Sequence, residues 1–249
     1  MNKLLKYEFH KLKSQKSFRV CSFILVLLLL LSAISTKALL GNNELAADLD
    51  ISVSHTLLAS LTSANFSLIA GIFVVLFVCD DFEQRTIKNI FSRGYSRVSV
   101  YAAKLVACIC AVTFMFIITI LSSLIFGNIY RMSGTLESRV ILLLLLQYLC
   151  QLGCMVFNFA LSAFLRKTGS AIAATLVAPM LINMALALIN SLFHIKKPQL
   201  AGYWISNFQT ELENLSTGDS RLLVCAALSL IYITIFAVFG ITSGKKTEF

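Results

Sequence analysis

Charge and proline are scarce in this chain of 249 residues. Charged residues make up 13% of the sequence, and only two residues are proline. Soluble globular proteins carry about a quarter of charged residues, so the composition excludes an ordinary soluble domain. Hydrophobic residues make up 58% of the chain, and the mean hydropathy is +0.84. These values are typical of a protein that crosses a membrane several times.

The sequence also lacks the motifs of several kinds of chemistry. It contains no H-E-x-x-H zinc motif and no G-x-x-x-x-G-K-[ST] phosphate-binding loop, and its three histidines are scattered. Cys150 and Cys154 share a helix face, but no histidine or carboxylate lies near them in the sequence. We therefore expect no catalytic residue, no metal site and no cofactor site in this chain.

Six apolar stretches are long enough to cross a membrane as helices, although the second is short. They cover residues 18–40, 64–79, 101–129, 140–165, 170–193 and 221–243. Several contain continuous apolar runs without the alternation of a β-barrel strand. The sequence thus predicts an all-α membrane protein with six transmembrane helices in one domain, residues 1–249.

The distribution of Lys and Arg predicts the orientation. If the N-terminus faces the cytoplasm, 15 of the 21 basic residues lie on that side. Basic residues concentrate on the cytoplasmic side of membrane proteins, so we expect both termini to be cytoplasmic. The basic residues are spread over four cytoplasmic segments, which argues against a nucleic-acid partner and favours contact with membrane lipids.

The segment before the first span, residues 1–17, predicts a basic amphipathic helix. Leu5, Phe9 and Leu12 fall on one face at helical spacing, and lysines occupy much of the remainder. Such a helix lies flat at a membrane surface. A solvated basic leader is the alternative. Outside the membrane, the loop of residues 194–220 is long, and Tyr203 and Trp204 with Phe208 favour a short helix or a re-entrant turn at the interface.

Polar and small residues within the spans mark candidate contacts or a translocation path. In the fourth span, Gln147, Gln151 and Asn158 share a face, which suits either bonding to another helix or a path for an amphipathic substrate. The fifth span carries a stripe of small residues and a proline that should kink it. Its candidate residues are Ser170, Ala174, Pro179, Asn183 and Asn190.

A charged segment, residues 80–97, separates the second and third spans. We expect a short amphipathic helix there, with Asp80 or Asp81 as its cap and Gly94 at its end. Ser96 is placed to cap the third span. Ile87, Ile90 and Phe91 form an apolar patch that suits a socket on a soluble partner. The alternative is a solvated loop whose charges serve only topology.

The same segment resembles ABC-2-type ABC transporter permeases, in particular small bacterial six-helix permeases of the bacitracin- and lantibiotic-immunity type. The residues that carry the resemblance are Glu83, Thr86-Ile87-Lys88-Asn89, Arg93-Gly94-Tyr95-Ser96-Arg97 and Lys104. The resemblance extends to the helix layout of the whole chain. Arg85 stands where many relatives have glycine, and Gly94 stands where proline is frequent.

The resemblance implies a permease subunit of an exporter in the plasma membrane of a bacterium. It implies two permease copies, or one copy and a sister chain, above separate ATPase subunits that bind ATP and Mg²⁺. Substrates of such permeases include amphipathic antimicrobial peptides and lipid-like molecules. The implied ATPase-coupling residues are Asp81, Glu83, Arg85, Thr86, Ile87, Lys88, Ile90, Phe91, Arg93, Gly94 and Arg97. A membrane sensor or scaffold that recruits a soluble partner without transport is the alternative function.

Overall fold

The computed structural model describes residues 2–40, 53–62, 64–84, 86–92, 94–129, 138–193, 200–212 and 218–243. Within these ranges every regular element is a helix. Six helical segments are long and apolar enough to cross a membrane, namely Lys16–Ser35, Leu57–Glu83, Arg97–Phe126, Arg139–Leu165, Thr168–Leu192 and Asp219–Ser243. The predicted all-α protein with six candidate spans is confirmed.

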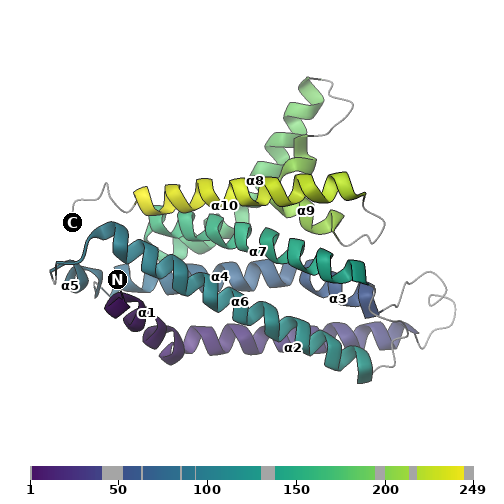
Figure 1. The fold of residues 1–249 in the computed structure, drawn as a ribbon, viewed down its shortest axis with the longest axis horizontal. Helices are drawn as coiled ribbons and strands as arrows, with labels where there is room; N and C mark the ends of the chain where they lie inside the picture. Colours follow the sequence, from purple (N-terminus) through teal and green to yellow (C-terminus); the bar gives the residue numbers. More distant parts are fainter. Residues whose placement is uncertain are drawn as a thin grey trace.

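The long helices run side by side along the molecule, with α5 at one end and α3 near the other (Figure 1). In chain order the elements are α1 (Asn2–Ser14), α2 (Lys16–Leu40), α3 (Val53–Thr62), α4 (Ala64–Glu83), α5 (Thr86–Ser92), α6 (Arg97–Ile129), α7 (Ser138–Leu165), α8 (Thr168–Leu192), the 3₁₀ helix η2 (Leu200–Tyr203), α9 (Ile205–Glu211) and α10 (Asp219–Ser243). Helix α1 lies at the same end as α5. The elements of the predicted cytoplasmic side therefore gather at one end.

Helix α7 lies at the centre and packs most extensively against α10 and α4. Gly240 allows α10 to approach α7 closely. A Cβ at this position would lie 3.0 Å from the Phe159 ring and 3.3 Å from the Cα of Ala160. On the other side, the buried rings of Phe73 and Phe77 fill the space between α4 and its neighbours, and Phe18 packs edge-on against Phe73. Small residues set the helix distance and large rings fill the remaining volume.

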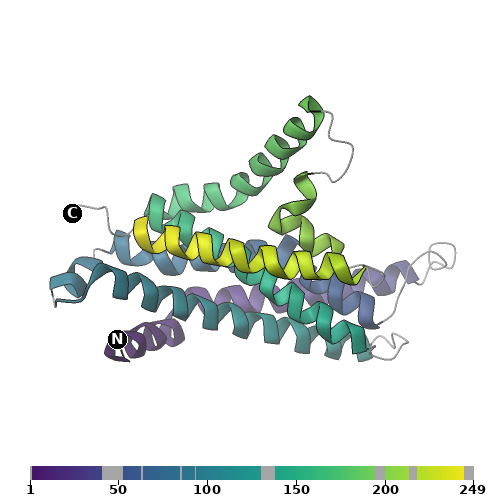
Figure 2. The same cartoon turned by 45° about the horizontal axis from the view of Figure 1, so that its top comes forward.

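Helix α8 diverges from the other spans toward its C-terminal end, and α9 lies between α8 and α10 (Figures 1 and 2). Only 6% of the apolar segment of α8 is buried. Ala171 and Thr175, which contact the rest of the bundle, are the buried residues of this helix in the described chain. Ser170 is exposed and Ala174 is only partly buried, so the predicted stripe of small residues is not the face that packs within this chain.

The second span is longer than the sequence predicted. Helix α4 continues past Cys79 to Glu83, so α4 includes the first residues of the predicted coupling segment. We expected Asp81 to begin a helix in water, whereas its side chain is buried near the end of α4. The correction has an electrostatic reason, because Asp81 is paired with lysines from two other helices.

Helix α1 is formed as predicted, and one of its faces packs against the bundle. Leu4, Glu8 and Leu12 are buried, and Leu4 packs against the start of α6. Phe9 is 39% exposed, so the predicted stripe of Leu5, Phe9 and Leu12 is not the packed face. The packed face includes an acidic residue because a buried lysine of α6 lies opposite it.

Candidate functional site

A buried cluster of charged side chains joins α1 to the C-terminal end of α4 and the N-terminal part of α6. The Nζ atom of Lys104 contacts Asp81 and lies 3.4 Å from Oε1 of Glu8. The Nζ atom of Lys11 lies 2.5 Å from Oδ1 of Asp81. Lys104 and Glu8 are fully buried, and Asp81 is nearly so. We call Glu8, Lys11, Asp81 and Lys104 the ion cluster.

The ion cluster is balanced, with two carboxylates facing two ammonium groups. Each group is therefore paired, which is the condition under which proteins tolerate buried charge. Burial raises the pKa of the Glu8 carboxyl above its usual value of 4.5, and the Lys104 ammonium opposes this rise. The ion cluster holds α1 and α6 against the end of α4.

Helix α5 is bonded directly to the ion cluster. The Thr86 hydroxyl, in its first turn, donates a hydrogen bond to Oδ1 of Asp81 at 2.9 Å. At its other end, Gly94 adopts a φ of +81°, and its N–H bonds to the Phe91 carbonyl at 2.9 Å. This positive φ favours glycine. Gly94 therefore ends the helix as the sequence predicted.

The apolar patch of α5 does not form an exposed knob. Ile87 is 1% exposed, and Ile90 and Phe91 pack against the cluster of Leu4, Val100 and Ala103 from α1 and α6. Complete burial of such a side chain stabilises a fold by about 1.5–3 kcal/mol. Ile87 is therefore not available to a partner's socket, whereas Ile90 and Phe91 are only partly buried.

The start of α6 is capped as expected. The Ser96 hydroxyl accepts a hydrogen bond from the N–H of Ser99 at 3.2 Å, and the Arg97 guanidinium lies 5.7 Å from the centre of the Phe91 ring. Three predicted coupling positions are not fully covered. Arg85 and Arg93 lie outside the described residues, as does the side chain of Lys88.

The end of α4 also contacts α8. Oε1 of Glu83 accepts a hydrogen bond from the N–H of Thr168 at 2.8 Å. Arg166, in the turn between α7 and α8, has a φ of +58°, which is uncommon for a residue other than glycine. Its guanidinium lies 5.9 Å from the centre of the Phe82 ring and donates to the Ser243 carbonyl at 3.4 Å. The C-terminal end of α4 is thus connected to α1, α6 and α8 and, through Arg166, to the end of α10.

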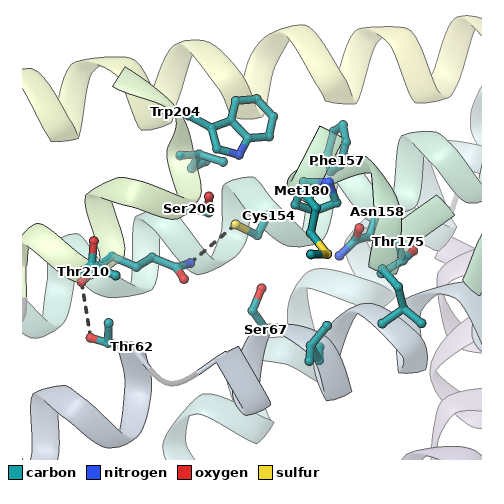
Figure 3. A pocket seen from close by; sticks show the side chains of 15 residues that line it. Thr62, Ser67, Cys154, Phe157, Asn158, Thr175, Met180, Trp204, Ser206 and Thr210 are labelled. Carbon is teal, nitrogen blue, oxygen red and sulfur yellow. Dashed lines mark hydrogen bonds between the residues drawn. The ribbon is translucent and has the colours of Figure 1, made fainter. Parts of the chain in front are cut away.

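A cavity of about 500 Å³ lies between α4, α7, α8 and α9 (Figure 3). Its walls are mainly apolar, but Ser67, Cys154 and Asn158 point into it, as does the indole nitrogen of Trp204 (Figure 3). The Gln209 side chain of α9 donates a hydrogen bond to Sγ of Cys154 at 3.4 Å. Cavities of about 300–1,000 Å³ are typical of small-molecule sites.

Some of the predicted path residues line this cavity. Asn158 and Pro179 do so, whereas Gln147, Gln151, Ser170, Ala174, Asn183 and Asn190 are not among the lining residues. Gln151 donates to the Leu61 carbonyl at 2.8 Å, and Asn183 accepts from Asn207 of α9 at 3.1 Å. These two side chains therefore make helix contacts, which was one of the two expected roles.

The sequence did not point to the α9 side of the cavity. Trp204 was expected at a membrane interface, but it is 6% exposed and packs against Phe157 of α7. Arg221 of α10 anchors this region with two bonds of 2.8 Å to Glu211 and one of 2.8 Å to the Gly202 carbonyl. No periodicity in the sequence indicates these contacts, since they join separate elements.

Within the described ranges, no group of three or more His, Cys, Asp or Glu side chains could hold a metal ion. A model of the protein family described as "Protein of unknown function (DUF2705)" matches residues 29–249. The chain belongs to this family. The DUF2705 match includes Asp81, Lys104 and the whole cavity, whereas Glu8 and Lys11 precede it. A search of curated proteins finds no match.

Proposed function

We propose that this chain is the permease subunit of an ABC-2-type ATP-binding-cassette exporter in a bacterial plasma membrane, driven by a separate ATPase subunit. Both termini would be cytoplasmic, and a second copy or a sister chain would complete the pathway. The chain itself would catalyse no reaction. The six apolar helices support a membrane role, and the absence of a phosphate-binding loop in the sequence requires that ATP be bound elsewhere.

The observation that carries the proposal is the attachment of α5 to several spans at once. Asp81 joins α5, through Thr86, to Lys11 of α1 and Lys104 of α6. Two residues later, Glu83 binds the first turn of α8. A force applied to α5 would therefore act on α4, α6 and α8 together, rather than being absorbed by a free loop.

The same connections link α5 to the cavity. Helices α4 and α8 provide two of its walls, through Ser67 and Leu68 on α4 and through Thr175 and Leu176 on α8. A partner that moves the end of α4 against α8 would change the width of the cavity. Such coupling between a cytoplasmic contact and a distant site needs a packed element shared by both, and α4 is that element.

The corrected geometry changes which residues a partner would touch. Ile87 is buried, whereas Glu83, Ser92 and Gly94 are exposed around α5. The docking surface would thus include Ser92 of α5 together with Glu83 and Gly94 on either side of the helix. The buried patch serves a different purpose, because it transmits force from that surface to α1 and α6.

The test is co-expression of the chain with the ATP-binding-cassette subunit encoded by a neighbouring reading frame. We expect a stable complex whose ATP hydrolysis depends on the permease. Ser92→Trp, on the outer side of α5, should weaken the complex at least severalfold. Ser35→Trp, at an exposed position near the C-terminal end of α2, is the matched control and should leave the complex intact.

Two results would contradict the proposal. One is an ATPase whose rate and association are indifferent to the wild-type chain. The other is a complex that Ser92→Trp and Ser35→Trp affect equally. A stable complex with a soluble partner that does not hydrolyse ATP would favour the sensor or scaffold function.

A further inference from the structure

Three buried polar atoms in the wall of the cavity have no hydrogen-bond partner among the described residues. They are Oδ1 of Asn158, Oγ1 of Thr175 and Nε1 of Trp204. The three side chains are 5%, 3% and 6% exposed. An unsatisfied buried polar group costs about 1–3 kcal/mol, and native structures contain few of them. Three in one cavity indicate that the cavity binds something that satisfies them.

The unpartnered atoms define the chemistry of the missing group. Asn158 Oδ1 requires a donor, Trp204 Nε1 requires an acceptor, and a threonine hydroxyl can serve as either. A hydroxyl meets all three requirements because it donates and accepts. Among the described residues that line the cavity none is charged, so an ion would lose its hydration without gaining a counter-charge. The polar part of the ligand is therefore neutral.

The apolar part of the ligand is indicated by the rim. Leu68, Leu176 and Met180 line the cavity and are also 36%, 42% and 72% exposed. All three belong to candidate spans, α4 and α8. The cavity consequently opens sideways, between two helices whose outer surfaces suit the hydrocarbon of a bilayer. A hydrocarbon chain could extend through this opening without meeting water.

We propose that this cavity binds an uncharged lipid with a hydroxyl-bearing head group and a hydrocarbon chain. The head group would bond Asn158, Thr175 and Trp204, and the chain would leave past Leu176 and Met180. If the protein is a permease, such a lipid is the class of substrate it moves; this transport role rests on the proposed function, whereas binding of the lipid does not. A cationic peptide does not suit these neutral walls.

The chain contains one tryptophan, and it lies in the cavity wall, so its fluorescence reports on binding. The probe is a monoacylglycerol with a brominated acyl chain, added to the full-length protein in detergent micelles. We expect saturable quenching of Trp204. The corresponding brominated fatty acid, added at a pH where it is ionised, should bind at least about tenfold more weakly.

Two variants remove polar atoms that have no protein partner in the described chain, so neither should impair folding. Thr175→Val preserves the shape of the side chain, and Asn158→Leu preserves most of the volume. Each should weaken binding of the monoacylglycerol about fivefold, the value of one neutral hydrogen bond. Asn65→Leu, an identical change on the exposed surface of α4, is the matched control and should bind as the wild type does.

Equal saturable quenching by the neutral and ionised probes would overturn the proposal. So would affinities for Thr175→Val and Asn158→Leu that match the wild type. The assay contains no ATPase, so its outcome is separate from that of the proposed function. Binding without ATPase coupling would support the lipid site and contradict the permease function. ATPase coupling without saturable quenching would support the permease function and contradict the lipid site.

Discussion

Oε1 of Glu83 accepts a hydrogen bond from the backbone N–H of Thr168 at 2.8 Å, across 85 residues of sequence. Glu83 ends α4 and Thr168 begins α8. The local cap position of α8 is Lys167, which makes no side-chain capping bond in the described chain. A carboxylate from another helix therefore performs the task that Ser or Asp at the N-cap usually performs.

The first prediction concerns this bond. Glu83→Ala should reduce ATP-coupled transport severalfold, because it separates the end of α4 from α8. Membrane insertion should remain at the wild-type level, since Glu83 is exposed. Glu83→Gln keeps an acceptor oxygen and should retain most of the coupling. The measurement is transport per ATP hydrolysed in proteoliposomes that contain both subunits. A Gln variant as impaired as the Ala variant would contradict this role.

The second prediction concerns Lys104. Lys104→Met preserves the length of the side chain but leaves the carboxylates of Glu8 and Asp81 without their shared cation. Removing one partner from a buried ion pair typically costs about 3–5 kcal/mol. We expect a large decrease in melting temperature, measured in detergent with a thiol-reactive dye that detects buried cysteines as they become exposed. Lys16→Met, at an exposed site, should melt as the wild type does.

The third prediction concerns pH. Burial raises the pKa of Glu8, so the folded protein binds a proton more tightly than the unfolded chain does. Stability therefore falls as pH rises from about 4.5 through the folded-state pKa, because the folded state must then hold a buried carboxylate. The Glu8→Gln variant has no ionisable group at this position. The melting temperature of this variant should decline less than that of the wild type over this pH interval. If the melting temperatures of the two proteins fell in parallel with pH, the raised pKa of Glu8 would be contradicted.

The fourth prediction compares two glycines. Gly240→Ala places a methyl group against the Phe159 ring and the backbone of Ala160, and overpacking of this kind typically costs about 1–3 kcal/mol. Gly169 is also helical, yet an added Cβ there meets nothing within 4 Å among the described residues. Gly169→Ala should be neutral or stabilising, since alanine favours helix by about 1 kcal/mol. Thermal unfolding of both variants tests the difference.

Local features of the sequence predicted several elements correctly. The six candidate spans agree with the apolar stretches, because the length of hydrocarbon needed to cross a bilayer is itself a local property. Gly94 and Ser96 end α5 and cap α6 as expected, since helix ends depend on the few residues around them. A short helix before the last span was also expected, and α9 confirms it.

The errors share one cause. Asp81 was expected in water because it belongs to a charged segment beside an apolar stretch. In the structure Asp81 and Lys104 neutralise each other, although 23 residues separate them, and Glu8 lies 96 residues before Lys104. Ile87 was predicted to face a partner, but contacts with other parts of the chain bury it. Hydropathy alone cannot distinguish a solvated charge from a paired one.

The sequence alone determined that this chain is helical, has six stretches long and apolar enough to cross a membrane and carries no phosphate-binding loop, because each of these properties depends on short stretches of residues. Only the tertiary structure decided which charges are buried together, which face of α8 is packed and that Asn158, Thr175 and Trp204 share one cavity. The physical reason is that pairing and enclosure depend on distances between helices. Those distances are set by how the helices pack, which residue spacing within one helix does not specify.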